Sequence, residues 1–174
     1  MTYDDTMREI ESEDPRHHWT GVLCEGRSVL DLGGGDFGNA RRLGYPATPD
    51  YWLENGATSV HVVDARADDI ARFDDSRMTT QCVTICLASQ VEHMIRKHKP
   101  QLVKCDIEGY EACLIGVSRE VFEMPEAYAI ETHSVDLYER SLRILERSGY
   151  EVLWVASHKH NGDVRVIYAE REDA

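Results

Sequence analysis

The chain has 174 residues, 42% of them hydrophobic and 29% charged, and its formal net charge is −13. This length can bury a full hydrophobic core, and the ordinary apolar content excludes a disordered or fibrous chain. The strong negative charge opposes binding to phosphate backbones, so we expect no nucleic-acid partner. No apolar run approaches the roughly 20 residues of a membrane span, so we expect no membrane partner.

The cysteines and the first residues of the chain bear on its location. Five cysteines occur without a CxxC pair, and their odd number argues against a disulfide framework. The acidic, polar segment over residues 1–14 differs from a secretory signal peptide. We therefore expect a cytoplasmic protein whose thiols are reduced.

The first part of the chain is predicted to alternate between strands and helices. Pro49 suits the first turn of a helix, and Gly56 follows the place where that helix should end. In chain order we expect a helix or arm over residues 1–20, a strand over 28–32, short helices over 39–43 and 49–54, strands over 59–64 and 78–87, and a helix over 89–97.

The second part continues this alternation and then ends in a hairpin. We expect a strand over residues 102–106, a helical turn over 110–115, a strand over 127–133, a helix over 135–147, and strands over 150–156 and 164–169. Asn161 and Gly162 are predicted in the loop of the final hairpin. The pattern predicts an α/β fold with a mostly parallel seven-stranded sheet, helices on both faces and a C-terminal antiparallel hairpin. Because no repeat or linker interrupts it, residues 1–174 are predicted to form one domain.

A glycine-rich loop follows the first predicted strand. Residues 33–38 fit the pattern G-x-G-x-x-G, in which glycines permit a sharp turn and the close approach of a ligand. Asp64, at the end of the next strand, could accept hydrogen bonds from two ribose hydroxyls. Asp31, before the first glycine, would repel a pyrophosphate but suits a cationic amino-acid group. A plain tight turn without a ligand is the alternative.

This arrangement of Asp31, the glycines and Asp64 resembles the first two motifs of class I S-adenosylmethionine-dependent methyltransferases. The resemblance implies a Rossmann-like fold in which the glycine loop holds the methionine portion and Asp64 the ribose. It also implies that residues 87–89 flank the adenine, and that S-adenosylhomocysteine is the product. The candidate cofactor-binding residues are Asp31, Gly33, Gly35, Asp64, Ala65, Leu87 and Ala88.

A second motif lies after the fourth predicted strand. Residues 104–111 resemble the K-x-D-x-E-G-x-E signature of FkbM-type methyltransferases, and residues 114–116 and 131–133 follow at the spacing of that family. The likeness extends over residues 28–134. It implies an FkbM-like methyltransferase, whose acceptor would lie near this motif.

Three residues are the candidates for acceptor binding and catalysis: Asp106, Glu131 and His133. Asp106 and His133 follow adjacent predicted parallel strands, and an imidazole with a pKa near 6.5 suits a general base. His133 could instead be a structural hydrogen-bonded residue, and Glu108 and Glu111 could simply begin a helix. The three candidates could also converge on a divalent metal, although their spacing does not demand one. The role of Lys104 stays open.

The sequence thus predicts methyl transfer from S-adenosylmethionine to an oxygen of a small-molecule or sugar-like acceptor. One alternative is an NAD-dependent oxidoreductase, against which stand the short chain and the lack of a clear Tyr-x-x-x-Lys pair. The other is a non-catalytic module that binds the cofactor. His17, His18 and Trp19 could shape the acceptor pocket, but we expect Trp19 to fix the N-terminal arm to the core. The acceptor and the oligomeric state are left open.

Overall fold

The computed structural model describes residues 7–10, 19–35, 47–158 and 161–171. Within these ranges, eight strands form one sheet in the order β1-β7-β8-β6-β5-β2-β3-β4. The strands are β1 (Met7–Ile10), β2 (Ser28–Leu32), β3 (Ser59–Asp64), β4 (Met78–Cys82), β5 (Leu102–Cys105), β6 (Ala127–Thr132), β7 (Tyr150–His158) and β8 (Asn161–Arg171). Strand β8 is antiparallel to both of its neighbours, and every other pairing is parallel. The predicted mostly parallel sheet with a terminal hairpin is confirmed.

Three details of the sheet differ from the prediction. Residues 7–10 form a strand that extends the edge of the sheet beside β7, where a helix or arm was expected. Strand β4 ends at Cys82, and residues 83–85, which were predicted to continue it, line a cavity instead. Asn161 pairs with His158, so it belongs to β8 and not to the hairpin loop. The helix predicted over residues 39–43, Gly38, His17 and His18 lie outside the described residues.

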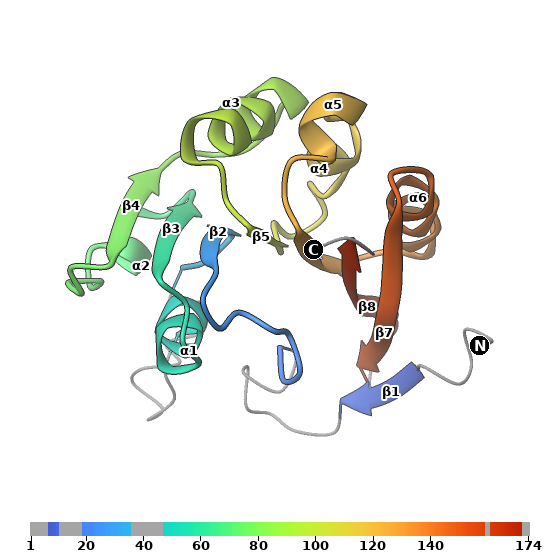
Figure 1. Cartoon of the computed structure of the whole chain (residues 1–174), viewed down its shortest axis with the longest axis horizontal. Coiled ribbons are helices and arrows are strands. Elements are labelled where there is room, and N and C mark those ends of the chain that lie inside the picture. Colours follow the sequence, from blue (N-terminus) through green and yellow to red (C-terminus); the bar gives the residue numbers. More distant parts are fainter. Residues whose placement is uncertain (1–6, 11–18, 36–46, 159–160, 172–174) are drawn as a thin grey trace.

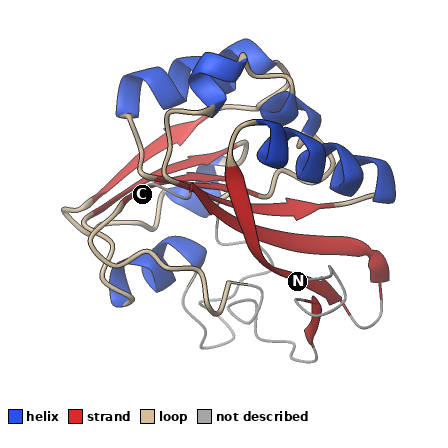
Figure 2. Cartoon of the chain, turned by 45° about the vertical axis from the view of Figure 1, so that its right-hand side comes forward, coloured by secondary structure: helices blue, strands red, loops and turns tan. Residues whose placement is uncertain are grey.

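Helices cover both faces of the sheet, as expected (Figures 1 and 2). They are α1 (Thr48–Glu54), α2 (Ala67–Ile70), α3 (Ala88–His98), α4 (Ala112–Ile115), α5 (Arg119–Phe122) and α6 (Val135–Arg147). The short helices α2 and α5 were not predicted. Helices α3 to α6 pack on one face, in a core that includes Leu30 and Val103. Helices α1 and α2 pack on the other face, in a core that includes Val29 and Val60.

The register of the parallel strands brings the carboxyl ends of β2, β3, β5 and β6 to the same end of the sheet. Buried apolar side chains on both faces hold these strands, which is the usual pattern of a covered parallel sheet. Helix α6 begins immediately after this edge, and the Leu137 N–H donates to the Ser134 hydroxyl at 3.2 Å as an N-cap. The cap holds the chain just after His133 in place. No helix in the described ranges is long and apolar enough to span a bilayer.

Candidate functional site

A cavity of about 340 Å³ opens at the carboxyl ends of β2, β3, β4 and β5. In open α/β sheets this edge is the usual place for a ligand, and the volume lies within the range of small-molecule sites. The described residues that line it are Gly33, Val63, Asp64, Ala65, Arg66, Val83, Thr84, Ile85, Asp106, Ile107, Glu108 and Tyr110. The cavity therefore joins the glycine loop to the residues that follow β3, β4 and β5.

Gly33 turns the chain at the end of β2 and closes one side of the cavity. Its φ of +78° lies in the left-handed region, which favours glycine. A Cβ at this position would lie 1.6 Å from the backbone oxygen of Asp106. The Gly33 N–H donates to the carbonyl oxygen of Val63 at 2.8 Å, so the turn is attached to β3 as well. The glycine is required by packing within the chain, independently of any ligand.

Asp64 lies in the cavity wall at the end of β3, as the sequence predicts. One of its carboxylate oxygens accepts a hydrogen bond from the Gly35 N–H at 3.0 Å, and the other accepts one from the Arg66 N–H at 2.8 Å. A Cβ on Gly35 would lie 2.6 Å from this carboxylate. A carboxylate has about four lone-pair positions, so Asp64 keeps capacity for further donors from a ligand. Ala65 also lines the cavity.

The predicted residues Leu87 and Ala88 do not line this cavity. Leu87 is 61% exposed, and Ala88, the first residue of α3, packs against the core. Because β4 ends at Cys82, the wall is formed instead by residues 83–85. Sequence reasoning missed this segment because its β-branched residues were taken as part of the strand.

Asp31 does not line the cavity either, but lies wholly buried beneath the glycine loop. Its carboxylate accepts a hydrogen bond from Trp52 Nε1 at 2.7 Å and lies 3.1 Å from Lys104 Nζ. These contacts account for a buried charge without a ligand. Its predicted role toward the cofactor stays a prediction.

Lys104, whose role the sequence left open, contacts both the glycine loop after β2 and Asp106 after β5. Its ammonium donates to the Gly33 carbonyl oxygen at 2.8 Å and lies 3.5 Å from the Asp106 carboxylate. Burial acts to lower the pKa of Lys104, but the Asp31 and Asp106 carboxylates outweigh it and raise that pKa. The ammonium also lies 5.2 Å from the ring centroid of buried Trp19. Trp19 is buried in the core, as expected, whereas residues 11–18 of the predicted arm lie outside the described residues.

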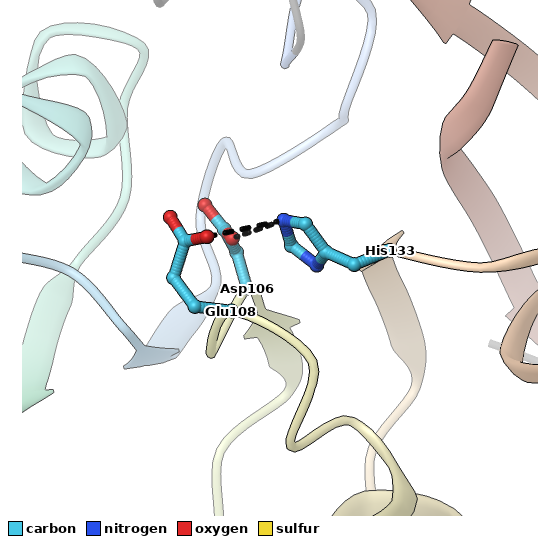
Figure 3. Close-up of side chains that lie close together, drawn as sticks. All are labelled: Asp106, Glu108 and His133. Atoms are coloured by element: carbon cyan, nitrogen blue, oxygen red, sulfur yellow. Dashed lines mark ion pairs between the residues drawn. The ribbon is translucent and has the colours of Figure 1, made fainter. Parts of the chain in front are cut away.

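His133 lies among four carboxylates, three from the loop between β5 and α4 and one from strand β6. Figure 3 shows His133 with two of them, Asp106 and Glu108. Its Nδ1 is 3.0 Å from Glu111 Oε1. Its Nε2 is 3.6 Å from Glu108 Oε2, 3.7 Å from Glu131 Oε1 and 3.9 Å from Asp106 Oδ1. The structure therefore brings together the predicted candidates Asp106, Glu131 and His133. It adds Glu108 and Glu111, for which a role at the start of a helix had been the alternative.

Glu111 holds the imidazole from the inside. Its side chain is wholly buried, and its Oε1 also accepts from the backbone N–H groups of Ile107 and Gly109, at 3.3 and 3.0 Å. Helix α4 begins immediately after it, but the Glu111 side chain makes no capping hydrogen bond. The second glutamate of the K-x-D-x-E-G-x-E pattern is therefore the residue that orients His133.

The carboxylates change the ionisation of the cluster. The hydrogen bond to Glu111 raises the pKa of His133 to about 9, although burial acts against this. Burial raises the pKa of Asp106 to about 7, while Lys104 lowers it and Glu131 raises it further. An imidazole with a pKa near 6.5 was expected to serve as a general base. In this arrangement the ring is protonated at neutral pH and has no free lone pair to accept a proton.

Several solved structures resemble this fold, whereas no protein-family model and no curated protein matches the sequence. The precorrin-6y C5,15-methyltransferase of Geobacter metallireducens is 14% identical, with a TM-score of 0.60 over 98% of this chain and 96% of that one. A protein in the NADB-Rossmann superfamily from Streptococcus agalactiae is 7% identical, with a TM-score of 0.61 over 93% and 69%. Fibrillarin from Aeropyrum pernix, solved with natively bound S-adenosyl-L-methionine, is 13% identical, with a TM-score of 0.54 over 85% and 68%. These likenesses establish the Rossmann-like fold, and the FkbM-like resemblance stays a prediction.

Proposed function

We propose that this protein transfers a methyl group from S-adenosylmethionine to an oxygen of a small acceptor. The observation that carries the proposal is the cavity at the carboxyl ends of β2, β3 and β5, whose lining includes Gly33, Asp64 and Asp106. The carboxyl ends of parallel strands are a usual place for a nucleoside-like ligand. The polar side chains clustered around His133 lie next to this cavity and suit an acceptor. The fold that the chain shares with a methyltransferase and with cofactor-bound fibrillarin supports this assignment.

Each wall of the cavity suits one part of the cofactor. Asp64 can accept hydrogen bonds from the ribose hydroxyls while it keeps its two backbone donors. Val83 and Ile85 offer apolar contact to the flat adenine ring. The glycine loop, with Gly33 and Asp106 nearby, would take the methionine portion and place the sulfonium toward the acidic cluster.

Methyl transfer requires mainly that the acceptor oxygen be positioned against the sulfonium. An acceptor oxygen held in line with the sulfonium forms a bond to the methyl carbon, the carbon–sulfur bond breaks with its electrons passing to sulfur, and S-adenosylhomocysteine leaves. The acceptor proton passes to a neighbouring base or to water. Protonated His133 would act here by attracting and orienting the acceptor, whereas Asp106 and Glu131 are the groups able to accept a proton.

Calorimetric titration with S-adenosylmethionine, S-adenosylhomocysteine and NADH tests the cofactor. We expect micromolar binding of the first two ligands alone. The variant Asp64→Ala should weaken that binding by about tenfold or more, because a hydrogen-bonding carboxylate is lost. Asp74→Ala, which removes an exposed carboxylate outside the cavity, is the matched control. Binding of NADH alone would assign an oxidoreductase instead, and cofactor binding without turnover of any acceptor would assign a non-catalytic module.

Three finer predictions accompany this function. The small-molecule or sugar-like nature of the acceptor rests on the sequence resemblance. The extent of a single methyltransferase domain over residues 1–174 rests on the absence of a linker. A cytoplasmic location rests on the composition and on five cysteines without a disulfide partner.

A further inference from the structure

We infer that Asp106, Glu108 and His133 bind a divalent cation, and that this cation holds an acceptor through two neighbouring oxygens. The binding of the cation stands on geometry alone, whereas its action on the acceptor rests on the proposed methyl transfer. The three side chains come from the loop after β5 and the end of β6, and they point toward one another (Figure 3).

The distances suit a shared ion. One ligand atom from each of Asp106, Glu108 and His133 lies within 4.8 Å of the other two. His133 Nε2 is 3.6 Å from Glu108 Oε2 and 3.9 Å from Asp106 Oδ1, which is too long for hydrogen bonds. Ligands at about 2.1 Å from one ion lie up to roughly 4 Å apart, so small side-chain movements would close the set.

Glu111 provides a second, independent indication. This carboxylate is wholly buried and directs its Oε1 at His133 Nδ1, 3.0 Å away. Its Oε2 has no hydrogen-bond partner among the described residues. A carboxylate that holds the far nitrogen of a histidine fixes the ring and turns Nε2 outward, which is the arrangement seen behind metal-bound histidines. A cation bound at Nε2 would also compensate the buried charge of Glu111 through the ring.

The charge around the cluster is unbalanced. Asp106, Glu108, Glu111 and Glu131 all lie within 3.9 Å of one imidazole. Lys104 lies 3.5 Å from Asp106, but its ammonium is closer to the wholly buried carboxylate of Asp31, at 3.1 Å. The excess of negative charge favours a divalent cation at the place where these carboxylates meet. The mixed oxygen and nitrogen ligands suit Mn²⁺ and ions similar to it.

The position of the cluster indicates which acceptor such an ion would take. Asp106 and Glu108 line the cavity together with Gly33 and Asp64, so an oxygen bound to the ion lies beside the cofactor. Three protein ligands leave coordination positions open, and an acceptor with two adjacent oxygens fills two of them as a chelate. A metal-bound hydroxyl loses its proton to water more easily, so no protein base is needed.

Titration of the chelator-treated full chain with MnCl₂, followed by electron paramagnetic resonance of the free ion, tests the site. No cofactor or acceptor is present, so failure here is distinguishable from failure of the methyltransferase assignment. We expect one site with micromolar affinity. Glu108→Gln should weaken it about tenfold or more, and His133→Gln should weaken it further. The Glu108 side chain is 64% exposed, so its variant keeps the fold even if the histidine variant does not.

Glu120→Gln is the matched control, because that carboxylate is 79% exposed on α5 and is not among the cluster residues. It should leave Mn²⁺ binding unchanged. Absence of Mn²⁺ binding in the unmodified protein would overturn the inference, as would equal affinity in all three variants. With Mn²⁺ and S-adenosylhomocysteine bound, a catechol should change the resonance spectrum of the bound ion, while phenol should not. If the catechol and phenol gave the same spectrum, the chelating acceptor would be rejected and only the cation site would stand.

Discussion

Two groups of charged residues lie next to each other at the edge of this sheet, and they differ in how their charges are compensated. Asp31 and Lys104 are both wholly buried, and the carboxylate also accepts from Trp52. Around His133, by contrast, several carboxylates share a single imidazole beside an open cavity. A buried pair must be matched internally, because an unpaired buried charge is very costly. A partly open cluster can keep an excess charge, which leaves it able to bind a ligand.

The largest expected effect comes from breaking the buried pair. Lys104→Met leaves Asp31 charged and without its cation in the protein interior, which should lower the free energy of unfolding by about 3–5 kcal/mol. Urea denaturation at pH 7 measures the change. The double variant Asp31→Asn/Lys104→Met should recover much of this loss, because it removes both charges. A single variant that loses less than about 1 kcal/mol would contradict the assignment of a matched buried pair.

The next effect concerns Gly33, where the two charged groups meet. Gly33→Ala should cost about 3 kcal/mol, because the new Cβ would collide with the backbone of Asp106. Gly149→Ala is the control, since Gly149 has the same φ of +78° but open space around its Cβ position. We expect it to cost only about 1 kcal/mol, the strain of the left-handed backbone. Thermal unfolding of both variants separates the two contributions, and equal losses would show that the collision is relieved.

A smaller effect concerns His61, whose pKa shifts in the opposite direction to that of His133. Burial lowers the pKa of His61 to about 4, and the charge of His98, whose ring centroid lies 3.6 Å away, lowers it further. The folded-state pKa lies below the unfolded value of 6.5, so the unfolded chain binds the proton more readily between these values. Stability should therefore be complete above pH 6.5 and fall as the pH drops toward 4, by on the order of 2 kcal/mol.

Denaturation curves at pH 7, 6, 5 and 4.5 measure this dependence. The variant His61→Asn removes the titrating ring, so it should have a shallower dependence over the same range. Lys97 also acts to lower the pKa of His61, and Thr79 holds the ring by a hydrogen bond of 2.6 Å. An unchanged slope in the variant would assign the pH dependence to other groups.

The parts of the site that follow from short stretches of chain could be predicted. Asp64 ends a strand, and the glycine loop and Asp106 each follow one, so the alternation of strands and helices was sufficient to bring them to the same end of the sheet. The end of β4 could not be predicted in this way. Residues 83–85 have the composition of a strand, but in the folded chain they line the cavity instead of pairing in the sheet.

The local sequence pattern also did not predict the partners or the ionisation of the charged side chains. Nothing near Asp31 in the sequence shows that Trp52 and Lys104 meet it in the interior. The pKa of His133 depends on Glu111, 22 positions earlier in the chain. Hydrogen bonds and charges act through space, so the ionisation of a side chain depends on neighbours that only the folded chain supplies.

The sequence by itself determined the alternation of strands and helices from residue 28 onward, apart from the short helices α2 and α5, together with the mostly parallel sheet and the end of that sheet where the candidate site residues lie. Hydrophobic periodicity and glycine positions carry that information because they act between near neighbours in the chain. Only the tertiary structure decided that Asp31 is a buried counter-ion and that His133 is the shared partner of several carboxylates. These roles depend on distances between residues that are remote in sequence, and packing of the whole fold sets those distances.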